Sequence, residues 1–387
     1  MAIQRDIHSN ITALALFFIL GNSILYLEPL SIIHLFFSGM RMLAVAYAIS
    51  LVLNNRLLGG YAWLICIAYA ALGAVTYMHH GALNMWASFC LNSIGISTLT
   101  YYSIQRSPER TLDIFAHIFA IFIFANLLLM LPGINSLMNG GNLLGRNYNQ
   151  VGATLLCGII IHSAAYHMHL RTFRYALLIC AICTLTPIYL GSMTSSVGCV
   201  IASAFLLIPN KNLRRITIIS FFLFYMIFQA LVVFMQKDLS DNKQIAYFVE
   251  DVLKKDLTFT DRARVWIVAL DMIQDSPTTG YGIRNNDWFE DYLKVKSAHN
   301  IFLQVAIYGG YIFLAAFLII IATAVIRSFK NRTSVTDSLL FGLAVFFFMM
   351  MMENYNLVLI LCMVNILYYS PELSEAISPK QISDVND

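Results

Sequence analysis

The chain has 387 residues, of which 59% are hydrophobic and 12% are charged, with a mean hydropathy of +0.71. Soluble globular proteins carry about 25% charged residues, so this composition excludes an ordinary soluble domain. The net charge of +3 comes with no exposed basic stripe with interleaved aromatic residues, so we expect membrane lipids as neighbours and no nucleic acid as a partner.

Apolar segments of roughly 17 to 25 residues, the length that crosses a hydrocarbon core as helix, recur from Ile11 to Tyr369. An alternating, barrel-type pattern is absent, which leaves helices as the spanning structure. We therefore predict an all-α polytopic membrane protein. Its twelve expected spans are residues 11–27, 30–53, 59–78, 82–104, 111–131, 148–168, 174–190, 192–209, 214–235, 299–326, 335–352 and 355–370.

Basic residues in the short connections predict the orientation, because cytoplasmic loops are enriched in Lys and Arg. With a cytoplasmic N-terminus, the inside segments hold thirteen Lys and Arg residues and the short outside loops hold only Arg146. The large loop is left out of this comparison, because long segments cross the membrane largely regardless of their charge. The pair of spans around GSMTSSVG, residues 191–198, could instead be one re-entrant hairpin, which leaves the sides unchanged. We expect residues 1–235 to form spans one to nine, 236–298 a large periplasmic loop, 299–370 three further spans and 371–387 a cytoplasmic tail.

The large loop is the one long polar segment, and its cations, Arg284 among them, are available to an anionic ligand. Residues 243–255 have apolar residues at helical spacing and predict an amphipathic helix. A second helix is expected from Arg262, capped by Asp261 or, next best, Thr260. The first helical position favours an anion. Arg262 and Trp266 would then share a face, while Arg264 points away.

Where the chain re-enters the membrane, Ser297 is expected to cap a helix that has His299 and Asn300 in its first turn. A histidine at the interface can accept a proton near neutral pH, although an ordinary interfacial role is an alternative. In the short Gly- and Asn-rich outside loop, Arg146 and Asn149 either line the same external site or belong to a simple turn.

Arg41 stands about ten residues inside the second expected span, where a charge is costly and should face the bundle interior or a watery cavity. It is either a structural partner within the bundle or an anchor for a phosphate.

The seven cysteines all lie in apolar segments, and the CxxC pair of Cys180 and Cys183 has no second pair or histidine cluster near it. We expect buried thiols and no metal site.

Two strings, DRARVWIVALDMIQDSPTTGYGI and the later SAHNIFLQVAIYGGY, resemble the motif of the bacterial O-antigen polymerase and O-antigen ligase superfamily. The resemblance covers about fifty residues closely, and the large loop before the last three spans fits the same plan. Its matching positions are Arg262, Trp266, Pro277, Gly280, Gly282, Ala298, His299, Asn300, Gly309 and Gly310. GSMTSSVG lacks the arginine that members often carry there, and GRNYNQ replaces an Asp-Pro-Asn motif, so Arg41 or Arg146 is the candidate for a third cation.

The resemblance implies a GT-C-like, metal-independent glycosyltransferase that needs no cofactor and acts at the periplasmic face of the bacterial inner membrane. The donor would be an undecaprenyl-diphosphate-linked saccharide. Arg262, helped by Arg41 and Arg146, would stabilise the leaving diphosphate, because guanidinium binds phosphate oxygens bidentately. His299 would activate the acceptor hydroxyl and Asn300 or Tyr281 would hold the sugar ring. Trp266 would either stack on sugar or pack in the core of the loop.

A polymerase, which joins the growing chain to another lipid-linked repeat unit, is our preferred interpretation because SAHNIFLQ resembles the polymerase form more closely. A chain-length regulator protein is then an expected partner. The first alternative is a ligase, which moves the finished chain to lipid A–core in lipopolysaccharide biosynthesis. The second is a transporter or lipid-linked sugar flippase, which predicts several intramembrane charges and pseudo-symmetric halves.

Overall fold

The computed structural model describes residues 2–55, 59–131, 142–145, 148–234 and 260–375. Within these ranges every regular element is a helix, as the apolar pattern predicted. The elements are α1 (Ala2–Ile24), α2 (Ser31–Asn55), α3 (Gly60–Met78), α4 (Leu83–Arg106), α5 (Pro108–Leu129), α6 (Tyr148–His167), α7 (Phe173–Tyr189), α8 (Met193–Leu206), α9 (Lys211–Phe228), the π-helical segment η2 (Gln229–Phe234), α11 (Thr260–Asp275), α12 (Asn286–Leu293), α13 (Ile301–Lys330), α14 (Ser334–Met350), α15 (Leu357–Tyr368) and α16 (Ser370–Glu375).

Each of the twelve expected apolar segments corresponds to one helix, α1 to α9 and α13 to α15. In the described residues, α2, α3, α5, α13 and α9 with the start of η2 are long and apolar enough to cross a membrane, and α1, α7, α8, α14 and α15 contain shorter apolar stretches. The protein is thus an all-helical polytopic membrane protein. Which parts lie in the membrane and which in the periplasm remains a prediction.

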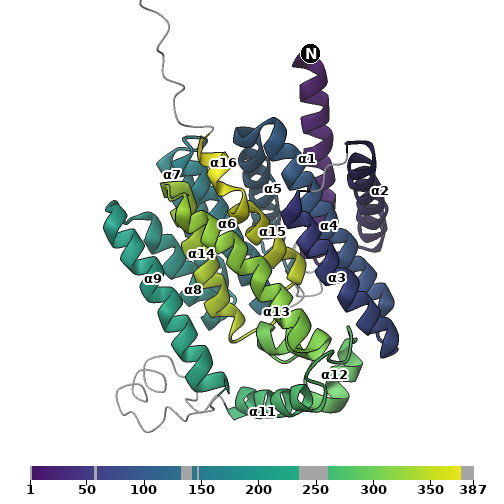
Figure 1. Ribbon diagram of the computed structural model, residues 1–387. Coiled ribbons are helices and arrows are strands. Elements are labelled where there is room, and N and C mark those ends of the chain that lie inside the picture. The colour runs from purple at the N-terminus through teal and green to yellow at the C-terminus, as the bar shows by residue number, and fades with distance from the viewer. Residues whose placement is uncertain (1, 56–58, 132–141, 146–147, 235–259, 376–387) are drawn as a thin grey trace, which may run out of the picture.

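Burial separates the inner helices from the outer ones. Nearly every residue of α6, α14 and α15 is buried, whereas α2 and α9 expose large apolar side chains such as Ile32, Leu35, Leu53, Ile216 and Leu223. Exposed apolar surface on this scale is unfavourable in water and favourable against lipid. Helices α2 and α9 therefore form lipid-facing edges on either side of a core built by α6, α14 and α15 (Figure 1).

The two ends of the bundle differ in their contents. Helices α11 and α12 lie together at one end, whereas α16 and the start of α1 lie at the opposite end (Figure 1).

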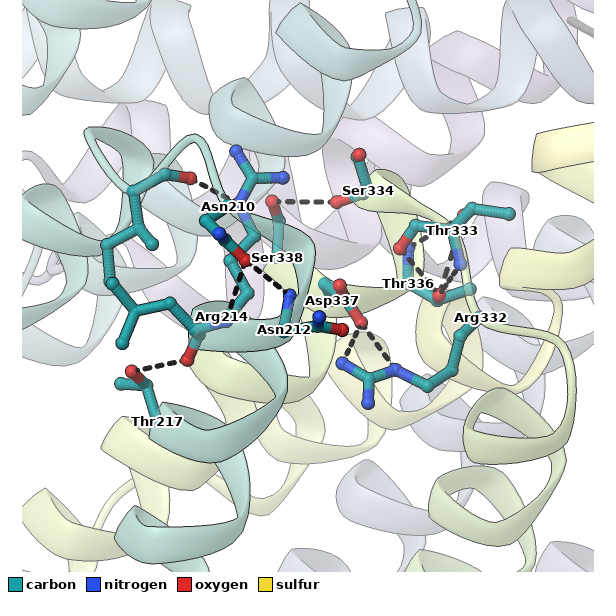
Figure 2. Close-up of polar contacts among 12 residues, drawn as sticks. Asn210, Asn212, Arg214, Thr217, Arg332, Thr333, Ser334, Thr336, Asp337 and Ser338 are labelled. Carbon is teal, nitrogen blue, oxygen red and sulfur yellow. Dashed lines mark hydrogen bonds and ion pairs between the residues drawn. The ribbon is translucent and has the colours of Figure 1, made fainter.

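At the α16 end, ion pairs and caps tie the helix ends together (Figure 2). Both Nε and Nη2 of Arg332 donate to Asp337 Oδ1, at 2.8 and 2.6 Å, and Arg214 Nε donates to the carbonyl of Ile208. Thr333 and Thr336 form a reciprocal cap at the start of α14. These hydrogen bonds compensate most of the polar groups at this end of the bundle for the loss of water.

The loop helices differ from expectation at their starts. Helix α11 already includes Thr260 and Asp261, so neither residue caps it, and Arg262 lies in its first turn rather than at its first position. Ser297 does not cap α13 either, because Asn300 does. Helix α12, whose N-cap is Asn285, has no counterpart among the expected elements. The amphipathic helix expected at residues 243–255 lies outside the described residues.

The Pro-Thr-Thr-Gly-Tyr-Gly turn after α11 packs directly on a kink in α13 at Gly309 and Gly310. Backbone N–H groups of Tyr281 and Gly282 donate to the carbonyls of Ile307 and Tyr308, both at 2.8 Å. Gly310 has φ of +60° and ψ of −166°, and a Cβ there would lie 2.3 Å from the Thr278 carbonyl carbon. Only glycine suits this backbone conformation and this close approach.

Gly310→Ala is therefore expected to destabilise the protein by about 1–3 kcal/mol through the backbone conformation alone, with the close contact adding to the loss. Gly60→Ala is the matched control, because nothing lies within 4 Å of a Cβ at Gly60. Thermal unfolding of both variants in detergent checks this. Equal melting temperatures for the two variants would show that the turn does not depend on the kink.

Candidate active site

One carboxylate, Glu353, gathers residues from distant parts of the chain at the end of the bundle that carries α11. It lies in the loop between α14 and α15 and is 8% exposed. Its Oε1 is 3.0 Å from His299 Nδ1, and its Oε2 accepts a hydrogen bond of 2.9 Å from Asn149 Nδ2. Arg262 Nη2 lies 3.9 Å from the same Oε2. The cluster thus contains His299, Arg262 and Asn149, three of the residues predicted for the site.

The neighbours of His299 in sequence fix its position. Asn300 Oδ1 accepts from the N–H groups of Phe302 and Leu303, and Asn300 Nδ2 donates to Gln229 Oε1 and to the Met351 carbonyl. His299 itself has φ of +48°, a left-handed conformation that is uncommon outside glycine. The cap therefore holds a strained backbone that directs the imidazole at Glu353, the kind of strain that functional sites retain.

Asn149 is in turn held by hydroxyl groups of α8 and its N-cap. Ser192 Oγ lies 2.9 Å from Asn149 Oδ1 and 2.8 Å from Ser195 Oγ. Helices α6 and α8 approach closely here, because a Cβ at Gly152 would lie 2.0 Å from Ser195 Oγ. GSMTSSVG, which lacks an arginine, thus supplies hydroxyl groups that support the amide of Asn149.

The two arginines of α11 are not equivalent, as their helical spacing predicted. The side chain of Arg262 is 32% exposed and lies beside Glu353, whereas Arg264 is exposed. Trp266 is 1% exposed and belongs to the hydrophobic core. Of the two interpretations of Trp266, the structure shows core packing, and the ring has no free face for a sugar.

Two other predicted residues hold the turn after α11 in place. Tyr281 Oη donates to the Met272 carbonyl at 3.1 Å, and burial raises the pKa of this phenol, which favours the protonated form that can donate. Arg284 donates through Nη2 to the carbonyl of His79 at 2.7 Å and through Nη1 to that of His80. Arg284 thus satisfies carbonyls at the C-terminal end of α3, where a cation is favourable.

Arg41 contacts a serine of α4 and none of the residues of the Glu353 cluster among its described hydrogen bonds. Its Nη1 donates to Ser88 Oγ of α4 at 2.9 Å, which is the structural role that we weighed against phosphate binding. Asn300, expected to hold a sugar, is fully buried, and both the oxygen and the nitrogen of its amide form hydrogen bonds within the protein. Arg146 lies outside the described residues.

Glu353 is the residue that the sequence reasoning missed. It follows four methionines at the end of an apolar segment, in MMMMENYN. Ionisable residues in apolar spans are rare and are candidates for a functional site, and Glu353 directly follows such a span. A search for ionisable residues at both ends of every span would have found it.

The cluster can carry out general base chemistry next to a cation. Because an ionised carboxylate only accepts hydrogen bonds, His299 must carry its proton on Nδ1, which leaves the lone pair of Nε2 as the base. The imidazole is 28% exposed, so a hydroxyl group can reach it. Arg262 adds a permanent positive charge on the same side.

Residues 176–318, which include Arg262 and His299, match the family model described as O-antigen ligase. The match confirms the resemblance to the O-antigen polymerase and ligase superfamily, without distinguishing polymerase from ligase. No curated protein matches the chain.

Proposed function

We propose that this chain, a member of the O-antigen polymerase and ligase superfamily by its residues 176–318, is a polysaccharide polymerase. It would transfer a glycan chain from undecaprenyl diphosphate onto a lipid-linked repeat unit at the periplasmic face of the inner membrane. The observation that carries the proposal is the His299–Glu353 pair, with its 3.0 Å hydrogen bond, beside Arg262. A chain-length regulator protein is the partner expected from the resemblance.

His299 acts on the acceptor. Its Nε2 takes the proton of one sugar hydroxyl of the acceptor while that oxygen forms a bond to the anomeric carbon of the donor. General base catalysis of this kind contributes about 10² to 10⁴-fold to a rate. Glu353 keeps the proton on Nδ1 and stabilises the imidazolium that forms, in the way that a buried carboxylate supports a catalytic histidine.

Arg262 acts on the donor. As the bond between the anomeric carbon and the diphosphate oxygen breaks, its electron pair stays on that oxygen, and the departing group becomes more negative. A guanidinium in place before the reaction stabilises this charge. The proposal is metal-independent because arginines supply the positive charge, with Arg146 as a second cation proposed from the sequence alone.

The second candidate function is ligation to lipid A–core, which the description of the matching family model favours. The two reactions share a donor and differ in the acceptor. Our choice of polymerase depends on the likeness of SAHNIFLQ to the polymerase form, so a direct test must separate them.

The test is to remove the gene from its own host, restore it on a plasmid and compare the lipopolysaccharide of both strains on a gel. A polymerase predicts that the deletion strain shows core plus one repeat unit and that the plasmid restores the long ladder. Core alone, with lipid-linked polymer accumulating, would mean a ligase. An unchanged ladder in the deletion strain would refute both activities.

A further inference from the structure

A cavity of about 270 Å³ opens at the same end of the bundle, between the ends of α1, α6 and α15. Its polar and aromatic lining comes from the connection after α1, the first turns of α6 and the loop before α15. The lining residues with hydrogen-bonding or aromatic groups include Tyr26, Glu28, Gln150, Thr154, Tyr355 and Asn356.

The cavity shares a wall with the candidate active site. On α6, Asn149 donates to Glu353 while the next residue, Gln150, lines the cavity. In the loop before α15, Glu353 belongs to the cluster while Tyr355 and Asn356 line the cavity. Gln150 follows Asn149 directly, and Tyr355 lies two residues after Glu353. The cavity is therefore lined, on two separate elements, by close sequence neighbours of the residues that form the cluster with His299.

The wall is held rigidly by Asn356. Its Nδ2 donates to the Ser23 carbonyl at 2.6 Å, and its Oδ1 accepts from the Val358 N–H at 2.9 Å as the cap of α15. Asn356 thus fastens the start of α15 to the end of α1 at this wall of the cavity.

The chemistry of the lining selects an uncharged, hydroxyl-rich ligand. Among the described lining residues there is one carboxylate, Glu28, and no cation. A carboxylate accepts hydrogen bonds from neighbouring hydroxyl groups, and tyrosine rings give an apolar face with a polar edge. A phosphate would be repelled by Glu28. The volume is just below the range of about 300–1,000 Å³ usual for small-molecule sites, which suits a sugar ring and not a lipid tail.

We propose that this cavity is the saccharide subsite for the acceptor, which rests on the proposed function of glycosyl transfer. The diphosphate of the donor is held where Arg262 lies, on α11. The acceptor must approach the anomeric carbon from the side away from the leaving diphosphate, so a cation-free space beside the elements that carry Asn149 and Glu353 is where its sugar belongs.

The test measures binding of a free saccharide to the purified protein in detergent. The probe is the repeat-unit oligosaccharide released by mild acid from the lipid-linked donor of the host, which carries no diphosphate. Glu28→Gln removes the charged acceptor from an exposed side chain, and Ala153→Leu fills the cavity from its wall. Glu109→Gln is the matched control, because Glu109 is also an exposed acid and lies at the start of α5, outside the cavity lining.

We expect Glu28→Gln to weaken binding of the oligosaccharide at least fivefold and Ala153→Leu to abolish it, with Glu109→Gln like wild type. Inorganic diphosphate is expected not to displace the saccharide. Unchanged affinity in Glu28→Gln, or displacement by diphosphate, would overturn the subsite. Because this readout needs no transfer, saccharide binding that depends on Glu28 in a protein without polymerase activity would leave the subsite standing while the proposed function fails.

Discussion

Replacing His299 with alanine is expected to remove the long glycan ladder while leaving the protein at its normal level in the membrane. Without Nε2 the cluster loses its proposed base, and Glu353, whose Oε2 still accepts from Asn149, lies on the far side of the space that the imidazole filled. The rate of transfer should fall by about 10² to 10⁴-fold. Lipopolysaccharide gels from the deletion host carrying the variant give the readout.

The two arginines of α11 provide the matched pair for the same experiment. Arg262→Ala should also abolish the ladder, because the charge beside Glu353 is lost, whereas Arg264→Ala should have a mild effect, because that side chain is exposed. A normal ladder in both His299→Ala and Arg262→Ala would show that the site lies elsewhere. The transporter or flippase interpretation would then be the preferred one.

Glu353→Gln is expected to lower the rate of transfer by roughly 10- to 100-fold, less than His299→Ala because the imidazole is kept. The amide no longer stabilises the imidazolium, and its NH₂ group can face Nδ1 of His299 and favour the wrong tautomer. Initial rates of purified variants on a lipid-linked repeat unit measure the loss.

The double variant shows whether Glu353 acts through His299. If it does, adding Glu353→Gln to His299→Ala should cause little further loss, since residues that act as a unit are not additive. Glu109→Gln, the same substitution at an exposed position on α5, controls for a lost surface charge. Two independent, multiplying losses would show that Glu353 stabilises the fold or binds substrate directly.

The helices could be predicted from the sequence because a membrane-spanning helix needs one property, a long apolar run. Segments such as 60–78 and 301–330 satisfy it without knowledge of their neighbours. Helix starts were less predictable, because several polar residues compete for the cap. Ser297 and Asn300 both suit that role, and the choice of Asn300 depends on Gln229 and Met351, which are remote in sequence.

The candidate site was predictable in part. The motif identifies His299 and Arg262 as candidates. That both lie beside one carboxylate could not be predicted, because Glu353 is more than fifty residues beyond His299 in the sequence. The same motif also contains residues that serve the fold. Trp266 fills the core under α11, and Gly310 lets the turn after α11 pack against α13. A sequence motif records both kinds of constraint without separating them.

The most direct measurement of the central claim, that His299 is the base of a glycosyl transfer, is an elongation assay with purified protein and a lipid-linked repeat unit in detergent. Wild type is expected to lengthen the glycan, and His299→Ala is expected to bind the released repeat-unit oligosaccharide with wild-type affinity and leave the donor unextended. Elongation by His299→Ala at the wild-type rate would contradict the claim.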